Sequence, residues 1–271
     1  MNRTVSSRLV ARTQPGTRLV YAVAAVRDPG YDSFAEDLAV TIDGVPASVT
    51  EVADHHGGRF HVLDTPEAAE VVFEYRAEVG GQADSPVADP ADLIRYVRPS
   101  RYCESDKLLP TSYAEFGALQ GVELLHAVRE WVAAELAYVP GSSRPIDGAV
   151  DTLLARRGVC RDYAHLVASL LRGKNVPARL AACYAPGLDP MDFHAVVEAY
   201  VDGAWHVVDA TGLAPRQGLL RISTGADASD TAFLSTVAGS LRLTELKVDA
   251  AWDAAAGDSA DPGAGIPVIL R

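Results

Sequence analysis

Three residues in the second half of the chain have the types and the order that nucleophilic catalysis requires. Cys160 stands where an apolar, helix-like stretch begins, His194 lies in a later strand-like run, and Asp209 ends the run after that. A thiolate attacks a carbonyl carbon, an imidazole moves the proton, and a carboxylate fixes the tautomer and the orientation of the imidazole. The three residues therefore predict a catalytic triad.

The position of Cys160 at a predicted helix start favours a reactive thiol. Helix N-termini and imidazolium neighbours promote ionisation of thiols, and the free backbone N–H groups there can receive a developing oxyanion. We therefore expect Cys160 to react faster than the other cysteines. Gly158 is expected to leave room for a substrate backbone, because it has no side chain.

The same chemistry orders the expected effects of substitution. Cys160→Ala should abolish turnover, because no other group can form the acyl-enzyme. His194→Ala should be nearly as severe. Asp209→Asn should be milder, because an amide can still accept a hydrogen bond from the imidazole.

Other residues near the triad are interpreted as structural. Cys103 and Cys183 show no partner pattern and are expected to fill the core or the surface. His165 is expected to pack or to hydrogen-bond, Asp162 to complement the positive end of the helix, and Tyr138 to pack beneath the site.

Hydrophobic periodicity places these residues in an α+β fold. Residues 18–79 contain short runs with partial alternation, separated by Gly, Pro and Asp, which is typical of an antiparallel β-sandwich. Residues 122–139 and 160–173 carry apolar side chains at helical spacing, and strand-like runs return from residue 178.

The composition shift at residues 79–92 marks a linker rich in Gly, Pro, Ala and Asp. We therefore predict an N-terminal β-sandwich-like domain at 1–88, a catalytic domain at 89–250 and a tail at 251–271 that can add an edge strand. The first domain is expected to supply no catalytic group. A chain starting near Asp89 should accordingly keep its reactive cysteine.

Charge and cysteine content exclude several functions. The chain has 271 residues with 24 Lys and Arg against 36 Asp and Glu, a net charge of -12, which disfavours nucleic acid and anionic membranes as partners. There is no long apolar run and no signal-peptide pattern at the start, so a cytoplasmic location is expected. Three cysteines without a CxxC motif predict neither a disulfide scaffold nor a metal site, and nothing indicates a cofactor.

The segments "RRGVCRDYAHLVASLLRGKNVPARLAACY" and "DFHAVVEAYVDGAWHVVDAT" resemble the catalytic core of the bacterial transglutaminase-like superfamily, which includes transglutaminases and cysteine proteases. The resemblance covers roughly residues 93–233. It implies a papain-like core, in which a helix carrying Cys160 packs on an antiparallel sheet carrying His194 and Asp209. It further implies that Cys160 is the nucleophile, His194 the base and acid, and Asp209 the orienting carboxylate.

The chain departs from the family pattern at two places. The family often has His-Ala-Trp where Val196 follows His194-Ala195 here, and Asp-Pro-Thr where Ala210 follows Asp209. Neither change removes a triad group, but the missing Trp alters the wall beside the histidine.

The leading functional hypothesis is amide chemistry through an acyl-thioester on Cys160. A peptide or protein amide would be the substrate, with hydrolysis favoured over transfer to an amine. The alternatives are a non-catalytic peptide-binding scaffold with the same fold and an acyltransferase that uses a small activated thioester. The acyltransferase is ranked lower because no coenzyme-binding motif is recognisable.

Overall fold

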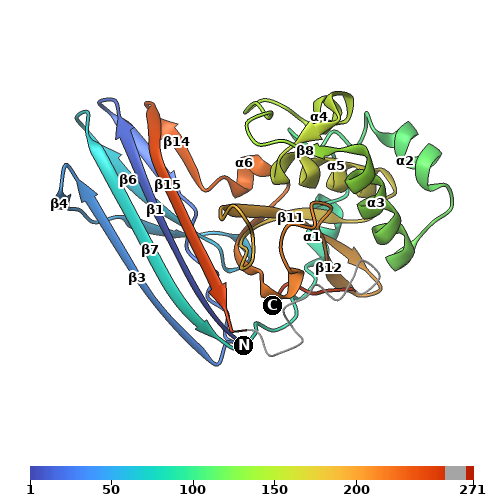
Figure 1. Ribbon diagram of the computed structural model, residues 1–271, viewed down its shortest axis with the longest axis horizontal. Coiled ribbons are helices and arrows are strands. Elements are labelled where there is room, and N and C mark those ends of the chain that lie inside the picture. Colours follow the sequence, from blue (N-terminus) through green and yellow to red (C-terminus); the bar gives the residue numbers. More distant parts are fainter. Residues whose placement is uncertain (254–266) are drawn as a thin grey trace.

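The molecule has two parts that lie side by side, a β-sandwich and a core of helices on a sheet (Figure 1). The computed structural model describes residues 1–253 and 267–271. Within these ranges, no helix combines the length and the apolar character that crossing a membrane requires.

The sandwich consists of two sheets whose strand pairs are antiparallel. In spatial order, the first contains β15 (Leu241–Trp252), β1 (Asn2–Thr13), β7 (Glu70–Gly80), β3 (Ser33–Ile42) and β4 (Val45–Pro46). The second contains β14 (Leu234–Ala238), β2 (Thr17–Tyr21), β6 (Arg59–Thr65) and β5 (Thr50–Ala53). Alternate residues of β1, β2 and β7 are buried, as the period of a strand requires, and Leu9, Leu19 and Phe73 pack in the shared interior.

Two strands of the sandwich come from the far end of the chain. β15 pairs with β1 from Arg3 opposite Trp252 to Thr13 opposite Leu241, and β14 pairs with β2. The predicted catalytic domain at 89–250 includes β14 and most of β15, so the structure corrects the predicted boundaries. Alternation in a sequence predicts that a segment is a strand, but it does not say which distant strand it joins.

The predicted tail is described only at its two ends. Residues 254–266 lie outside the described part of the chain. Residues 267–271 form no strand, although the backbone N–H of Val207 in β12 donates to the carbonyl of Val268 at 2.7 Å.

The core is an antiparallel four-stranded sheet covered by helices. Its strands, in order, are β12 (Ala204–Val208), β11 (Phe193–Val201), β10 (Ala178–Tyr184) and β13 (Leu220–Gly225). The helices are α1 (Pro90–Arg95), α2 (Leu109–Phe116), α3 (Gly121–Glu135), α4 (Ala149–Ala155), α5 (Cys160–Gly173) and α6 (Ala228–Thr231). Short elements complete it: β8 (Ala137–Tyr138), β9 (Arg157–Gly158) and the 3-10 turn η2 (Arg216–Gly218). A further 3-10 turn, η1 (His55–Gly57), joins β5 to β6 of the sandwich. The predicted α+β class, with a cysteine-bearing helix on an antiparallel sheet and a β-rich N-terminal region, is confirmed.

One face of the core sheet is shared between α5 and the sandwich. Residues opposite each other on neighbouring antiparallel strands lie on the same face. Leu180 and its partner Val197 belong to the apolar cluster around α5, whereas Tyr184 and its partner Phe193 belong to the cluster inside the sandwich. The boundary between the two layers therefore runs across the middle of β10 and β11.

A largely buried group of polar and charged side chains links the sandwich to the core. His56, in the turn before β6, lies 3.0 Å from Asp92 of α1. Nearby, Arg179 of β10 contacts Glu198 of β11 at 2.9 Å, and its guanidinium stacks on the Trp205 ring 4.1 Å away. Such pairs fix orientation, since removing one partner leaves a buried charge without compensation.

Candidate active site

Cys160 is the first residue of α5 and is partly exposed. The start of the helix is fixed by Asp162, whose carboxylate accepts from the backbone N–H of Val159 at 2.8 Å and from the Ser143 hydroxyl at 2.8 Å. A Cβ on Gly158 would lie 2.6 Å from the Cβ of Asp162. The glycine therefore makes room for this capping carboxylate, and its expected role beside a substrate backbone stays a prediction.

His194 and Asp209 meet on neighbouring strands at one end of the core sheet. His194 Nε2 lies 2.8 Å from Asp209 Oδ2, and both side chains are almost fully buried. The second carboxylate oxygen of Asp209 accepts from the Thr211 backbone N–H at 2.8 Å and from its hydroxyl at 2.7 Å. Arg129 Nε donates to the Asp209 carbonyl at 2.8 Å. Asp209 is thus held from three sides with one oxygen directed at the imidazole.

The pair is ionised together despite its burial. Burial alone would lower the pKa of His194, but the charge and hydrogen bond of Asp209, with a contribution from Cys160, raise it to about 10. Burial would also raise the pKa of Asp209, yet His194 and the Thr211 donors hold it below its usual range. At neutral pH the site therefore contains an imidazolium and a carboxylate.

The structure brings together all three residues that the sequence singled out. Nε2 of His194 is hydrogen-bonded to Asp209. The buried Nδ1 of His194 has no hydrogen-bond partner among the described residues. The Cys160 side chain interacts with the same ring, which leaves Nδ1 as the nitrogen available to the thiol.

Tyr138 is a neighbour of Cys160 whose contact the sequence did not reveal. Tyr138 in β8 lies opposite Gly158 of β9, and the Val139 N–H donates to the Gly158 carbonyl at 2.9 Å. The Tyr138 hydroxyl interacts with both the backbone and the side chain of Cys160. Burial, and then the neighbouring Cys160, raise the pKa of Tyr138 to about 12. The hydroxyl is therefore a proton donor beside the nucleophile.

A cleft of about 400 Å³ opens beside these residues. Its lining combines Cys160 and His194 with apolar side chains from the core sheet and from the segment that joins α6 to β14. All of these lining residues lie between Gly141 and Leu234 in the sequence.

The remaining candidates have other surroundings. Cys103 and Cys183 are fully buried; burial raises the pKa of Cys103 to about 11 and that of Cys183 further. His165 is buried against the Tyr102 ring, and its Nε2 accepts from the Ala228 N–H at 3.2 Å. Burial lowers the pKa of His165 to about 3, so the ring is neutral and suited to this acceptor role.

Comparisons with known proteins agree with this architecture. The model of the transglutaminase-like superfamily matches residues 113–210. The crystal structure of a candidate cysteine protease from Cytophaga hutchinsonii is 34% identical and superposes with a TM-score of 0.84 over 93% of this chain and 90% of that one. The chain belongs to the transglutaminase-like superfamily. Membership of this superfamily supports cysteine-based catalysis in general.

Other relatives are more distant. An uncharacterized protein of Mycobacterium leprae is 28% identical over 130 residues, which are 45% of this chain and 47% of that protein. The match thus spans about half the length of this curated relative. The periplasmic domain of TgpA from Pseudomonas aeruginosa is 20% identical, with a TM-score of 0.43 over 74% of this chain and 91% of that domain.

Proposed function

We propose that the protein is a cysteine-dependent amide hydrolase of the transglutaminase-like superfamily. In it Cys160 is the nucleophile, His194 the base and acid, and Asp209 the orienting carboxylate. One observation carries the proposal: His194 is held by Asp209 at 2.8 Å with its second ring nitrogen left for the first residue of α5. The likeness to the Cytophaga hutchinsonii protein, a candidate cysteine protease, supports the same chemistry.

Acylation begins from the state in which the proton of the Cys160 thiol has moved to His194. The Sγ thiolate attacks the amide carbonyl carbon, and the C–S bond forms as the carbonyl oxygen takes up negative charge. The Cys160 N–H at the helix start and the Tyr138 hydroxyl are the donors placed to stabilise that oxygen. The C–N bond then breaks, and the His194 proton goes to the leaving amine.

Deacylation reverses these roles. His194 takes a proton from water, the water oxygen attacks the thioester carbon, and the C–S bond breaks to release a carboxylic acid and the thiol. Cys160 is partly exposed in the cleft, so water has access to the thioester. This access favours hydrolysis over transfer, which requires that water be excluded and an amine be positioned.

Competitive alkylation tests the assignment of the nucleophile. Iodoacetamide at neutral pH should modify Cys160 at least about tenfold faster than Cys103 or Cys183. Imidazolium neighbours increase the reactivity of a thiol, and burial decreases it. Peptide mass spectrometry at limited reagent gives the three rates. His194→Ala should slow the modification of Cys160.

Matched variants make the test specific. His206→Ala removes another buried histidine, one whose Nε2 pairs with the Val201 carbonyl, and should leave the rate at Cys160 unchanged. Cys183 lies directly opposite His194 in the β10–β11 ladder, so Cys183→Ala controls for a second nearby sulfur. Equal rates at all three cysteines would disprove the proposal and favour a binding scaffold.

A further inference from the structure

We infer that the cleft selects amides flanked by a large apolar side chain, and that the segment joining α6 to β14 forms one wall of the subsite. This inference rests on the proposed role of Cys160. It concerns which substrate the site accepts, and it stands on the shape and composition of the cleft floor and walls.

The floor of the subsite is shallow because two alanines face each other on it. Ala182 of β10 lies directly opposite Ala195 of β11, and both line the cleft. Ala182 belongs to the cluster inside the sandwich and Ala195 packs against the cluster around α5, so the pair lies where the two layers meet. Two short side chains at this boundary leave a depression in the cleft floor beside His194.

The walls around this depression are apolar. Phe193 and Ile222 rise from the core sheet, and Phe233 and Leu234 come from the segment after α6. The Phe193 and Phe233 rings are stacked with centroids 5.2 Å apart. A side chain that enters is therefore surrounded by aromatic and aliphatic carbon, and burial of such a side chain is favourable in proportion to its apolar area.

The wall formed by Phe233 is fixed at both ends of its segment. At one end, the Ala228 N–H donates to His165 of α5 at 3.2 Å. At the other, the Phe233 carbonyl accepts from the Ala22 N–H at 3.0 Å, and Leu234 pairs with Tyr21 of β2. The helix that carries the nucleophile and the sandwich thus hold the wall together, so the subsite is formed before substrate arrives.

An acidic side chain gains little from the apolar walls of the subsite. Nη2 of the Arg161 guanidinium already donates to the Ser143 hydroxyl, the Arg144 carbonyl and the Asp162 carboxylate. Asp192, at the exposed edge, repels anions. An acidic residue would lose its hydration among the aromatic and aliphatic side chains of the subsite.

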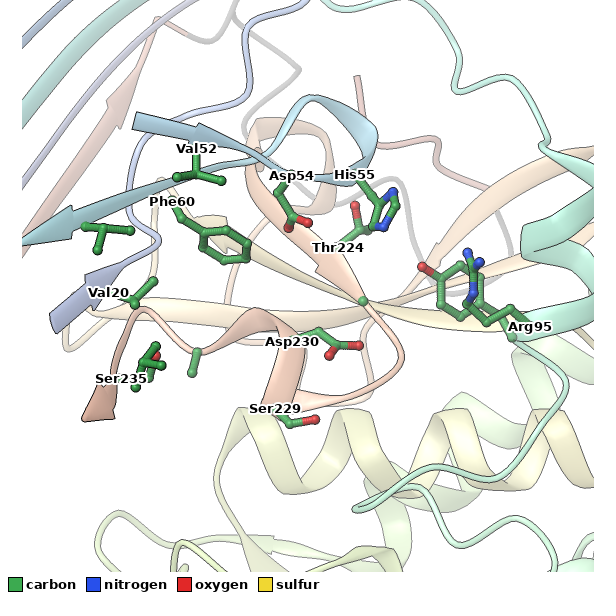
Figure 2. A pocket seen from close by; sticks show the side chains of 15 residues that line it. Val20, Val52, Asp54, His55, Phe60, Arg95, Thr224, Ser229, Asp230 and Ser235 are labelled. Atoms are coloured by element: carbon green, nitrogen blue, oxygen red, sulfur yellow. The ribbon is translucent and has the colours of Figure 1, made fainter. Parts of the chain in front are cut away.

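A second cavity, on the other side of the same segment, has a different character. This cavity has a volume of about 610 Å³. Figure 2 shows Val20, Val52 and Phe60 of the sandwich among its lining side chains, together with the carboxylates of Asp54 and Asp230. It shares Ala232 with the cleft but contains neither Cys160 nor His194. Val237 of β14 lies in this second cavity, which makes it a control position on the same strand as Leu234.

Peptidyl chloromethyl ketones test the preference directly, since the thiolate forms a C–S bond with the methylene carbon and chloride leaves. A set of N-acetyl-alanyl probes ending in Phe, Leu, Gly or Glu is reacted with the full-length protein, and the rate at Cys160 is followed by mass spectrometry. The Phe and Leu probes should react about 10–100-fold faster than the Gly and Glu probes. Iodoacetamide, which has no side chain to place, gives the reactivity of the thiol itself.

Two variants change the subsite in opposite directions. Ala195→Leu fills the floor and should slow the Phe and Leu probes about tenfold, toward the rate of the Gly probe. Phe233→Ala removes the wall and should slow the Phe probe by a similar factor. Val237→Ala should change none of the rates. Melting temperatures and iodoacetamide rates, measured for each variant, show that the fold and the thiol are intact.

The outcomes separate this inference from the proposed function. If iodoacetamide modifies Cys160 selectively but the four probes react at equal rates, or the Gly or Glu probe reacts fastest, the subsite inference is wrong and the nucleophile stands. If Phe233→Ala keeps the wild-type preference, the segment after α6 is not the wall. If iodoacetamide shows no selectivity for Cys160, the proposed function itself fails.

Discussion

The two layers on the shared face of the core sheet are built in opposite ways. α5 is one continuous segment, and the residues that accompany its cysteine follow within about fifty positions. The sandwich joins strands from both ends of the chain, with β1 beside β15 and β2 beside β14. The comparison teaches that reactive groups can be encoded locally, while the space in which they act depends on pairing between distant segments.

The largest expected effect comes from removing the N-terminal part of the sandwich. Deletion of residues 1–88 leaves β14 and β15 without partners and uncovers Tyr184 and Phe193 of the core sheet. We therefore expect an insoluble or misfolded chain, in contrast to the expectation from sequence that a chain starting near Asp89 stays reactive. Solubility, circular dichroism and labelling of Cys160 measure the outcome. A soluble fragment that labels at the full-length rate would show that the core does not need the sandwich.

The next effect concerns how the core holds its carboxylate. Both Thr211 donors point at one oxygen of Asp209. In Asp209→Asn the amide oxygen stays with Thr211, so the NH₂ group faces Nε2 of His194 and requires the tautomer that cannot accept the Cys160 proton. We therefore expect a loss of about 10³–10⁴-fold in activity, more severe than the sequence alone suggested.

A second substitution sharpens this prediction. Thr211→Val in the Asp209→Asn background removes the hydroxyl donor and frees the amide to turn over. The double variant should recover part of the loss, about tenfold, whereas Thr211→Val alone should cost activity. The rate of the Phe probe at Cys160 is the readout. A double variant that is slower than Asp209→Asn would contradict this account of the tautomer.

The smallest expected effect is the pH dependence of stability that the His194–Asp209 pair contributes. The pKa of His194 is raised from 6.5 to about 10, so its stabilisation is complete below pH 6.5 and is lost as the pH rises toward 10. The pKa of Asp209 is lowered from 3.8, so its stabilisation is present above that value and is lost as the pH falls. The difference in melting temperature between wild type and His194→Ala should therefore be widest between about pH 4 and 6.5.

Thermal unfolding followed across pH 4 to 10 measures this difference. Each kcal/mol corresponds to about 2–4 °C for a chain of this size. A difference in melting temperature between wild type and His194→Ala that increases from pH 6.5 to 10 would contradict this prediction. Val237→Ala, in the sandwich, should show a gap that does not vary with pH.

The reactive groups could be predicted from the sequence, whereas the pairing of distant strands could not. The types and order of Cys160, His194 and Asp209 identified the groups that the structure brings together, because hydrophobic periodicity showed which elements carry them. Thr211 was missed, although the pattern Asp-x-Thr is a known signal for a side chain that binds the backbone two residues on. Tyr138 was expected to pack beneath the site, but the interaction of its hydroxyl with Cys160 was missed, since it depends on a two-residue parallel ladder with no sequence signature.

The rest could not be predicted, for a physical reason. Phe233 reads as an apolar residue between two polar runs, and only the pairing of Leu234 with Tyr21 brings it over the floor of the cleft. Strand alternation is equally compatible with a place in the core sheet, and the predicted catalytic domain at 89–250 accordingly includes β14 and most of β15. The sheet that these strands join is determined by the apolar surface buried over a whole sheet face. Many residues each contribute a small part of that burial.

The pairing of β1 with β15 also sets an order of events during translation. β1 leaves the ribosome before the core does, and its neighbour β15 follows only after the strands and helices of the core have been made. The helix with Cys160 thus emerges before the strand that positions Phe233. A nascent chain would therefore carry its nucleophile before the substrate subsite is formed. Substrate selectivity would follow only when β14 and β15 have paired.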